Sequence, residues 1–235
     1  MNDVFAGDSL VPVLNEEGCE QIVHDVHRAR SLWRPRHGFY TLGAASYLDT
    51  NPGDYQQNNH YSSEAMRHIF SDLYDEVCAV ISGISELPSK VHEQLGPPGF
   101  HIFRGHPLLG SGLMHGGSIH IDTPHLQHAQ LLDPVDDVLA FTLPVALPAG
   151  GGGMFYWTEE TSMDVCGFPS DMDDEQLQWL ETNKKQIDYR LGHIALHDGK
   201  SLHQLASLCE PSDRDWRITL QGHGVLSDGV WHLYF

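Results

Sequence analysis

The spacing of apolar residues along the chain changes near residue 100. Before that point, apolar side chains recur every three or four positions in two stretches, as they do on one face of a helix. The first stretch follows Asn15, a suitable N-cap, and ends before Pro35. The second follows Ser62 or Ser63 and ends near Gly83. We therefore expect two amphipathic helices that cover a sheet.

The segment between the two predicted helices has no period. Residues 43–61 are rich in Asn, Gly, Gln and Tyr. A connection of this length without secondary structure is uncommon in a compact domain and often carries function. We interpret it as a candidate lid loop.

The second part of the chain consists of short β-forming runs that Gly and Pro separate. One stretch, residues 173–182, predicts a short helix among them. We expect an all-β barrel or sandwich over residues 99–235, with residues 1–98 as helical support, in a single domain over 1–235. The predicted strands are 100–104, 118–122, 138–147, 154–158, 186–190, 193–197, 202–207, 216–221 and 230–234.

Composition limits the classes of partner. With 40% hydrophobic and 19% charged residues, the 235-residue chain has the balance of a folded globular protein. Its net charge of −19 disfavours nucleic acid and anionic membranes as partners, because both would be repelled. The four cysteines form no CxxC pair, and the first residues do not form a signal peptide. We expect a cytoplasmic protein with no disulfide framework and leave its oligomeric state open.

A His-x-Asp triplet lies on one of the predicted strands. His120 and Asp122 are two positions apart, so their side chains project from the same face and can share one metal ion. A non-haem Fe(II) site needs two imidazoles and one carboxylate, with positions left open for a co-substrate and O₂. The second imidazole has to come from a distant strand.

His203 is the preferred second imidazole. It lies near the start of a predicted strand that returns after a turn at Gly199. His193 and His197 are alternatives, but both lie on the strand before that turn.

A buried arginine is predicted on the strand that follows. In residues 216–221, alternation places Arg217, Thr219 and Gln221 on one face and Trp216, Ile218 and Leu220 on the other. A guanidinium on an inward face needs an anionic partner, since an unpaired buried charge is very costly. That partner is either a carboxylate ligand or an Asp or Glu of the protein itself.

The ordered set His120-x-Asp122, His203, Arg217-x-Thr219 resembles the motif of the 2-oxoglutarate/Fe(II)-dependent oxygenases. Residues 138–157, with their four glycines, also resemble a strand–GG–strand element of the prolyl-hydroxylase-like members. The resemblance covers about residues 99–223 and implies a mainly β fold, a double-stranded β-helix (jelly roll) with N-terminal helices.

The resemblance also implies roles for these residues. His120, Asp122 and His203 would bind Fe(II), while Arg217 and Thr219 would bind the distal carboxylate of 2-oxoglutarate, which with O₂ is a co-substrate. Members often add one more polar contact, for which Arg104, Gln130 and Thr142 are candidates.

The implied activity is a dioxygenase that oxidises an unactivated C–H bond, by default a hydroxylation. An amino-acid derivative or a secondary metabolite is the expected kind of substrate. Two alternatives remain open: a peptide or protein hydroxylase of the same superfamily, and a catalytically silent, cupin-like module that binds metal or ligand. Halogenation is disfavoured, because in the halogenases of this superfamily a small residue replaces the carboxylate that Asp122 supplies.

Overall fold

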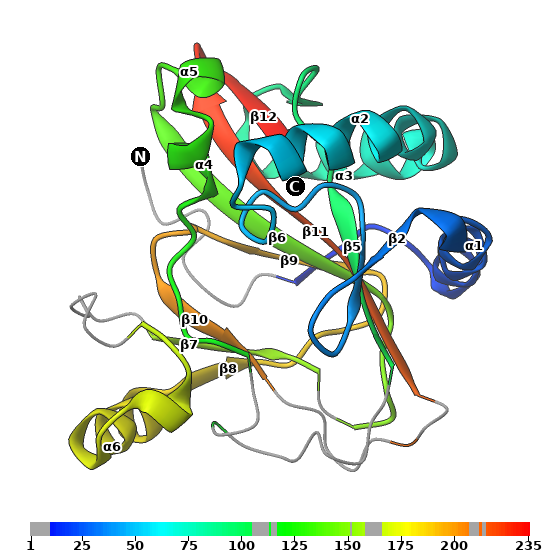
Figure 1. Cartoon of the computed structure of the whole chain (residues 1–235). Helices are drawn as coiled ribbons and strands as arrows, with labels where there is room; N and C mark the ends of the chain where they lie inside the picture. Colours follow the sequence, from blue (N-terminus) through cyan, green and yellow to red (C-terminus); the bar gives the residue numbers. More distant parts are fainter. Residues whose placement is uncertain are drawn as a thin grey trace.

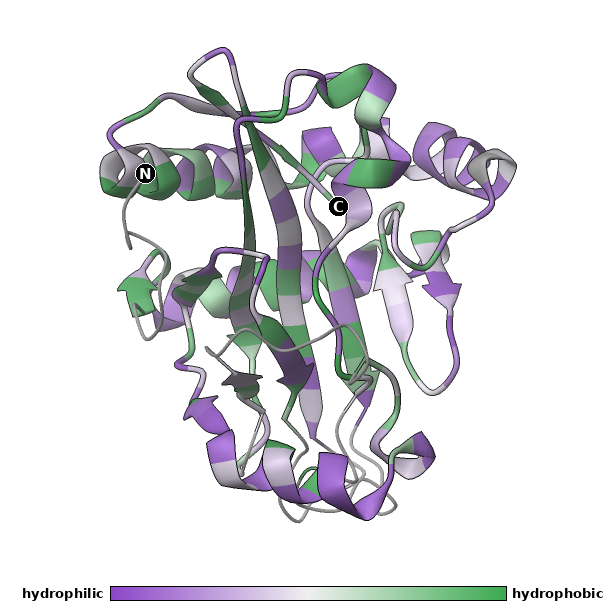
Figure 2. Ribbon diagram, turned by 90° about the vertical axis from the view of Figure 1, so that its left-hand side faces the viewer, coloured by the Kyte–Doolittle hydropathy of each residue, from purple (hydrophilic) through white to green (hydrophobic). Residues whose placement is uncertain are grey.

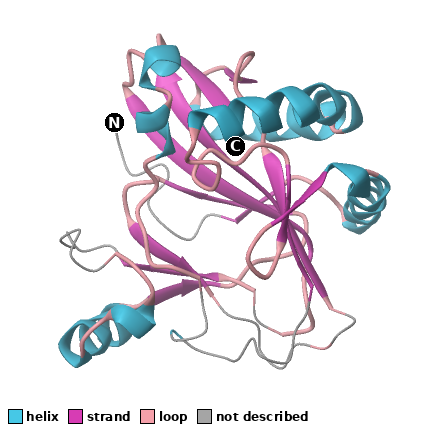
Figure 3. Ribbon diagram, in the orientation of Figure 1, coloured by secondary structure: helices cyan, strands magenta, loops and turns pink. Residues whose placement is uncertain are grey.

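Two mainly antiparallel β-sheets face each other, and helices pack on their outer sides (Figures 1 and 3). The computed structural model describes residues 10–104, 113, 117–150, 152–157, 166–206, 212 and 215–235. Because the predicted strands 154–158 and 202–207 end at residues 158 and 207, their last positions lie outside this part of the chain.

The larger sheet contains most of the strands. Its order is β1-β9-β6-β11-β5-β3-β2, and β12 joins β11 to β4. The central strand, β11, pairs with β5, β6 and β12. Its strands are β1 (Leu10–Pro12), β2 (Trp33–Pro35), β3 (Tyr40–Leu42), β4 (Ser89–Val91), β5 (Gly99–Arg104), β6 (Asp137–Ala146), β9 (His193–His197), β11 (Trp216–Ser227) and β12 (Val230–Tyr234).

The smaller sheet has the order β10-β7-β8, with β7 (Met154–Trp157), β8 (Lys185–Ile187) and β10 (Leu202–Leu205). The predicted strand 118–122 contacts the edge strand β10 by one isolated bridge, His120 to His203, and forms a second bridge from Ile119 to Gly167, outside the sheet. From β5 to β11 the chain thus alternates several times between strands of the larger sheet and strands of the smaller sheet. This winding is the double-stranded β-helix that the sequence predicts.

Helices cover the outer face of the larger sheet. These are α1 (Glu16–Arg28), followed by a 3₁₀ turn (Arg30–Leu32), α2 (Pro52–Ile69) and α3 (Ser71–Ser85). Their apolar side chains share one core with β5, β6, β9, β11 and β12. Because Ile218 and Leu220 point into that core, Arg217 and Thr219 point between the sheets. Hydrophobic and hydrophilic bands along the long strands reflect this alternation (Figure 2).

The smaller sheet has its own cover, α6 (Asp174–Asn183), which begins at the capping residue Asp173 as the sequence predicts. Leu180 of this helix packs with Phe155 and Trp157 of β7. Three short helices complete the described elements: α4 (Pro124–Gln127), α5 (Ala129–Leu132) and a 3₁₀ turn at Pro169–Asp171.

The predicted lid loop is wrong over half of its length, because α2 begins at Pro52 and runs through residues 52–61. Asn51 caps this helix by accepting a hydrogen bond from the Gly53 amide, and Pro52 occupies its first turn. Its inward face begins with Tyr55, Asn58 and Ser62, which are all buried. Two of these three side chains are polar, so the helical period does not show in a hydrophobicity pattern.

None of the described helices is long and apolar enough to cross a membrane. Cys19, Cys78 and Cys166 are free thiols. Cys209 lies outside the described residues.

Candidate metal and co-substrate site

The backbone brings the two sequence-distant histidines side by side. His120 and His203 form an antiparallel bridge in which each amide donates to the other's carbonyl, at 3.0 and 2.9 Å. The Asp122 amide donates to the carbonyl of Gly199, at 3.1 Å. The triplet is therefore fastened to the turn that precedes β10.

The three side chains converge on one point. His120 Nε2 lies 3.8 Å from Asp122 Oδ1, and His203 Nε2 lies 3.6 Å from Asp122 Oδ2. One potential ligand atom from each residue lies within 4.8 Å of the other two. Two imidazoles and one carboxylate at this spacing can hold a single metal ion.

Hydrogen bonds set the tautomer of both imidazoles. Nδ1 of His120 lies 2.9 Å from the carbonyl oxygen of Ser118, and Nδ1 of His203 lies 3.0 Å from that of Ser201. A carbonyl only accepts, so in each neutral ring Nδ1 carries the proton and Nε2 keeps its lone pair. Both Nε2 atoms face Asp122, as metal ligands should.

His197 has the opposite tautomer. Its Nδ1 accepts a hydrogen bond from the Gly199 amide at 3.3 Å, which leaves the proton on Nε2. That Nε2 lies 3.9 Å from Asp122 Oδ2, so it faces the carboxylate as a donor rather than as a ligand. His193 lies at the other end of β9, paired with Pro12. The geometry thus favours His203 over both alternatives.

Asp122 lies among four histidines. His223 Nδ1 is 3.8 Å from its Oδ2, in addition to the contacts from His120, His197 and His203. Burial by itself would raise the pKa of Asp122, but the surrounding imidazoles together hold it well below its ordinary value. The carboxylate is therefore ionised and available to a cation.

Arg217 is buried without an anionic partner. Its side chain is 1% exposed, and none of its three guanidinium nitrogens has a hydrogen-bond partner among the described residues. The guanidinium carbon lies 5.6 Å from the ring centre of Phe103 and 5.5 Å from that of Tyr189. Burial lowers the pKa of Arg217 to about 10, so the group remains charged near neutral pH.

Thr219 lies on the same strand face as Arg217, and its hydroxyl also lacks a partner among the described residues. Of the two partners considered for Arg217, an Asp or Glu of the protein is therefore not observed in the described part of the chain. A carboxylate group would suit this arrangement, because its two oxygens can accept hydrogen bonds from the guanidinium of Arg217 and from the hydroxyl of Thr219.

The three candidates for a further co-substrate contact differ in position. Thr142 is buried on β6 and hydrogen-bonds Tyr189, one of the two rings that flank Arg217. Arg104 is exposed at the end of β5, and Gln130 is exposed on α5. Only Thr142 of these three lies inside the barrel beside Arg217.

Sequence reasoning placed Gln221 on the same strand face as Arg217 but missed other inward residues near the proposed metal ligands. His101, Gln221, His223 and Tyr47 surround the space next to Asp122: the Tyr47 hydroxyl hydrogen-bonds His101 Nε2 and lies 3.5 Å from Gln221 Oε1. The predicted strand ended at residue 221, whereas β11 continues to Ser227. Extending its alternation by two residues would have found His223.

Comparison with known proteins supplies the fold and little more. No protein-family model matches the sequence, and no curated protein matches it. Among solved structures, the N-substituted L-amino acid dioxygenase from Burkholderia ambifaria AMMD, in complex with alpha-KG, is 12% identical. It aligns with 96% of this chain and 85% of that chain at a TM-score of 0.52. The chain shares the fold of that dioxygenase.

A second solved structure supports the same architecture. AviO1 from Streptomyces viridochromogenes Tue57 is 13% identical and aligns with 97% of this chain and 94% of that chain, at a TM-score of 0.50. Because nearly the full length of both chains aligns, the shared fold includes the N-terminal helices as well as the β-helix.

The buried histidines of the site predict acid sensitivity. Burial lowers the pKa of His101 from 6.5 to about 3, so this ring stays neutral in the folded protein while it takes up a proton in the unfolded chain below pH 6.5. Stability is therefore retained above pH 6.5 and lost as the pH falls towards 3. This one residue should lower the free energy of unfolding of metal-free protein by about 1.4 kcal/mol per pH unit.

Urea unfolding at pH 7 and pH 5 measures this loss. His101→Gln should reduce the difference between the two pH values, whereas His60→Gln, on the exposed side of α2, should leave it unchanged. Equal pH dependence in wild type and His101→Gln would contradict the assignment.

Proposed function

We propose that this chain is an Fe(II)- and 2-oxoglutarate-dependent dioxygenase that oxidises an unactivated C–H bond of a small molecule. One observation carries the proposal: Arg217 is buried and charged, with no partner among the described residues, on the inner face of the same barrel that brings two imidazoles and a carboxylate together. A protein that bound only a metal ion would have no reason to bury this guanidinium, because burying an unpaired charge costs free energy.

His120, Asp122 and His203 fit the metal. In this proposal their Nε2 atoms and carboxylate oxygen bind Fe(II), and the carbonyls of Ser118 and Ser201 hold the rings in the binding tautomer. When bound, Fe(II) supplies the activation of O₂ that couples decarboxylation of 2-oxoglutarate to oxidation of the substrate. In a hydroxylation, one oxygen atom enters succinate, the other enters the product, and the lost carboxylate leaves as CO₂.

Arg217 and Thr219 fit the co-substrate. 2-Oxoglutarate has a carboxylate at each end, so the guanidinium fork and the hydroxyl can receive one end while the other faces the metal. The rings of Phe103 and Tyr189 lie near the guanidinium, with centres 5.6 and 5.5 Å from its carbon atom. The carboxylate thereby supplies acceptors for two of the guanidinium nitrogens and for the Thr219 hydroxyl.

The substrate class rests on resemblance. The Burkholderia structure is named for N-substituted L-amino acids, which supports a small-molecule substrate such as an amino-acid derivative or a secondary metabolite. A peptide hydroxylase and a silent, cupin-like module are the alternatives. The buried arginine, which has no partner among the described residues, favours a protein that binds an anion inside the barrel over a module that binds metal alone.

Succinate formation tests the proposal. Protein incubated in air with Fe(II), ascorbate and 2-oxoglutarate should release succinate slowly, and a substrate should increase the rate. Treatment with a chelator should abolish the release, and added Fe(II) should restore it, because the three ligands hold the metal reversibly. Absence of 2-oxoglutarate binding to metal-loaded protein would exclude this function and leave the silent module.

A further inference from the structure

The cations near the site can be counted over the part of the chain that the structure describes. The sequence contains only 13 lysine and arginine residues, and all of them except Arg214 belong to the described part of the chain. Arg217 is the one whose guanidinium is fully buried without a hydrogen-bond partner there. If 2-oxoglutarate occupies Arg217, an anionic substrate needs a second cation inside the barrel.

The other cations near the interior already have partners. Arg36 donates both terminal nitrogens to Asp49, at 2.7 and 3.1 Å, and Arg34 lies 3.6 Å from the same carboxylate. Arg67 donates to backbone carbonyls of residues 92, 93 and 95. These guanidinium groups are therefore engaged by the protein itself.

The remaining cations lie on the outside. Arg104 is exposed at the end of β5 that pairs with Trp216, next to Arg217 and therefore at the co-substrate end of the barrel. The others are exposed or bound to nearby groups: Arg28, Arg30, Lys90, Lys184, Lys185 and Arg190.

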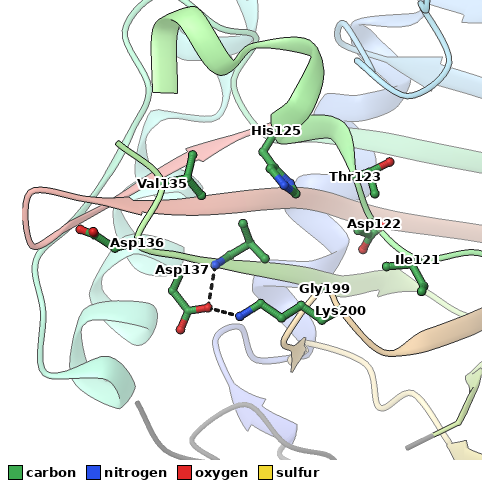
Figure 4. A pocket seen from close by; sticks show the side chains of 10 residues that line it. Ile121, Asp122, Thr123, His125, Val135, Asp136, Asp137, Gly199 and Lys200 are labelled. Atoms are coloured by element: carbon green, nitrogen blue, oxygen red, sulfur yellow. Dashed lines mark hydrogen bonds and ion pairs between the residues drawn. The ribbon is translucent and has the colours of Figure 1, made fainter. Parts of the chain in front are cut away.

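A cavity of about 340 Å³ lies beside Asp122, and its lining is acidic. Asp122, Asp136 and Asp137 line it together with a single cation, Lys200, whose Nζ lies 2.5 Å from Asp137 Oδ1 (Figure 4). With Fe(II) bound, Asp122 and the metal-facing carboxylate of 2-oxoglutarate balance the two positive charges of the metal, so Asp136 and Asp137 still face one ammonium group. The field at this opening therefore disfavours an anion.

The cavity and the co-substrate residues lie at different positions along β11. Val138, in its lining, pairs with Val225 of β11, which is eight residues from Arg217 (225 − 217). At about 3.3 Å per residue this separation is roughly 26 Å along the strand. Substrate entering here meets Asp122 without passing Arg217.

The wall between the two ends offers neutral hydrogen-bonding groups. Tyr47, His101 and Gln221 lie together there, and the Tyr47 hydroxyl contacts both of the others. His101 is uncharged near neutral pH, because burial lowers its pKa to about 3. These side chains can bind hydroxyl, amide or amino groups, and none of them supplies a positive charge.

From this distribution we infer that the substrate carries no anionic group: it is a neutral or cationic molecule that presents hydroxyl, amide or amino groups to Tyr47 and Gln221. The inference rests on the proposed function, because it assigns Arg217 to 2-oxoglutarate. It narrows the substrate class by excluding amino acids with a free carboxylate and phosphorylated compounds.

A paramagnetic metal can report which molecules approach the site. Protein loaded with Mn(II) and saturated with 2-oxoglutarate is mixed with phenylacetate, phenylacetamide or 2-phenylethylamine, which have similar size and differ in charge. Proton NMR line broadening by Mn(II) then measures how closely each probe approaches the metal. We expect the amide and the amine to be broadened about tenfold more than phenylacetate.

A pair of variants tests whether the lack of a cation on the inner wall is what keeps phenylacetate away from the metal. Gln221→Lys adds a cation to the inner wall and should bring phenylacetate to the broadening of the amide. Gln178→Lys adds the same charge to the exposed side of α6 and should change nothing.

Three results would overturn the inference: phenylacetate broadened as much as the amide in the wild type, no broadening of any probe, or no response to Gln221→Lys. The proposed function has its own measurement, a calorimetric titration of 2-oxoglutarate into Mn(II)-loaded protein. If 2-oxoglutarate fails to bind there, that function fails whatever the three probes show.

Discussion

Replacing His203 with alanine should reduce turnover by at least about 100-fold and weaken Fe(II) binding, with a fold that circular dichroism shows to be intact. In the proposed site this imidazole is one of three protein ligands found among the described residues, and His120 and Asp122 alone would not complete the set. Fe(II) affinity by calorimetry under anaerobic conditions and succinate release in air measure the two effects.

His197→Ala is the matched comparison. This histidine lies at a similar distance from Asp122, 3.9 Å against 3.6 Å for His203, but its proton is on the atom that faces the carboxylate. We expect Fe(II) affinity to fall by less than tenfold, about the effect of losing an outer partner of a metal ligand. If His197→Ala lost the metal and His203→Ala kept it, the second imidazole ligand would have to be reassigned.

The sequence predicted the positions of the candidate site because short-range geometry determines them. Residues two apart on an extended segment share a face, so His120 and Asp122 could be paired without a structure. The order of strand, glycine turn and returning strand then placed His203 opposite the pair. Its tautomer could not be predicted in this way, because it depends on the Ser201 carbonyl, and that of His197 depends on the Gly199 amide.

Long-range contacts explain what was missed. Tyr47 meets His101 and Gln221 only because a loop from the N-terminal part folds over the barrel, at separations of 54 and 174 residues. Asp49 holds this loop by binding Arg36 and Asn58, and these contacts also make one face of α2 polar. Because this face of α2 is polar, residues 52–61 show no helical period of hydrophobic residues, and the segment was interpreted as part of a lid loop.

Predicting the fold class from the sequence required fewer assumptions than predicting the residues around the site. Alternation and Gly or Pro breaks gave nine strands, and eight of them are recognisable as strands in the structure. The exception is 118–122, which forms only two bridges. Short edge strands such as β1 and β4, three residues each, carry too little pattern to be predicted.

Arg217→Lys should raise the apparent KM for 2-oxoglutarate by one to two orders of magnitude and leave Fe(II) affinity nearly unchanged. Lysine keeps the positive charge but loses the planar fork that meets a carboxylate with two parallel hydrogen bonds. Loss of one charge-assisted hydrogen bond corresponds to about 1.5–3 kcal/mol, which gives this range of KM. Succinate release at varied 2-oxoglutarate measures it.

Arg190→Lys provides the control, since Arg190 follows Tyr189 in the chain but its own side chain is exposed. The same conservative change there should leave KM for 2-oxoglutarate within about twofold of wild type, as is usual for surface substitutions. An unchanged KM in Arg217→Lys would separate the buried guanidinium from the co-substrate. The positive charge of Arg217 would then need another anion as its partner. The proposed metal site would also have no identified residue that makes it specific for 2-oxoglutarate.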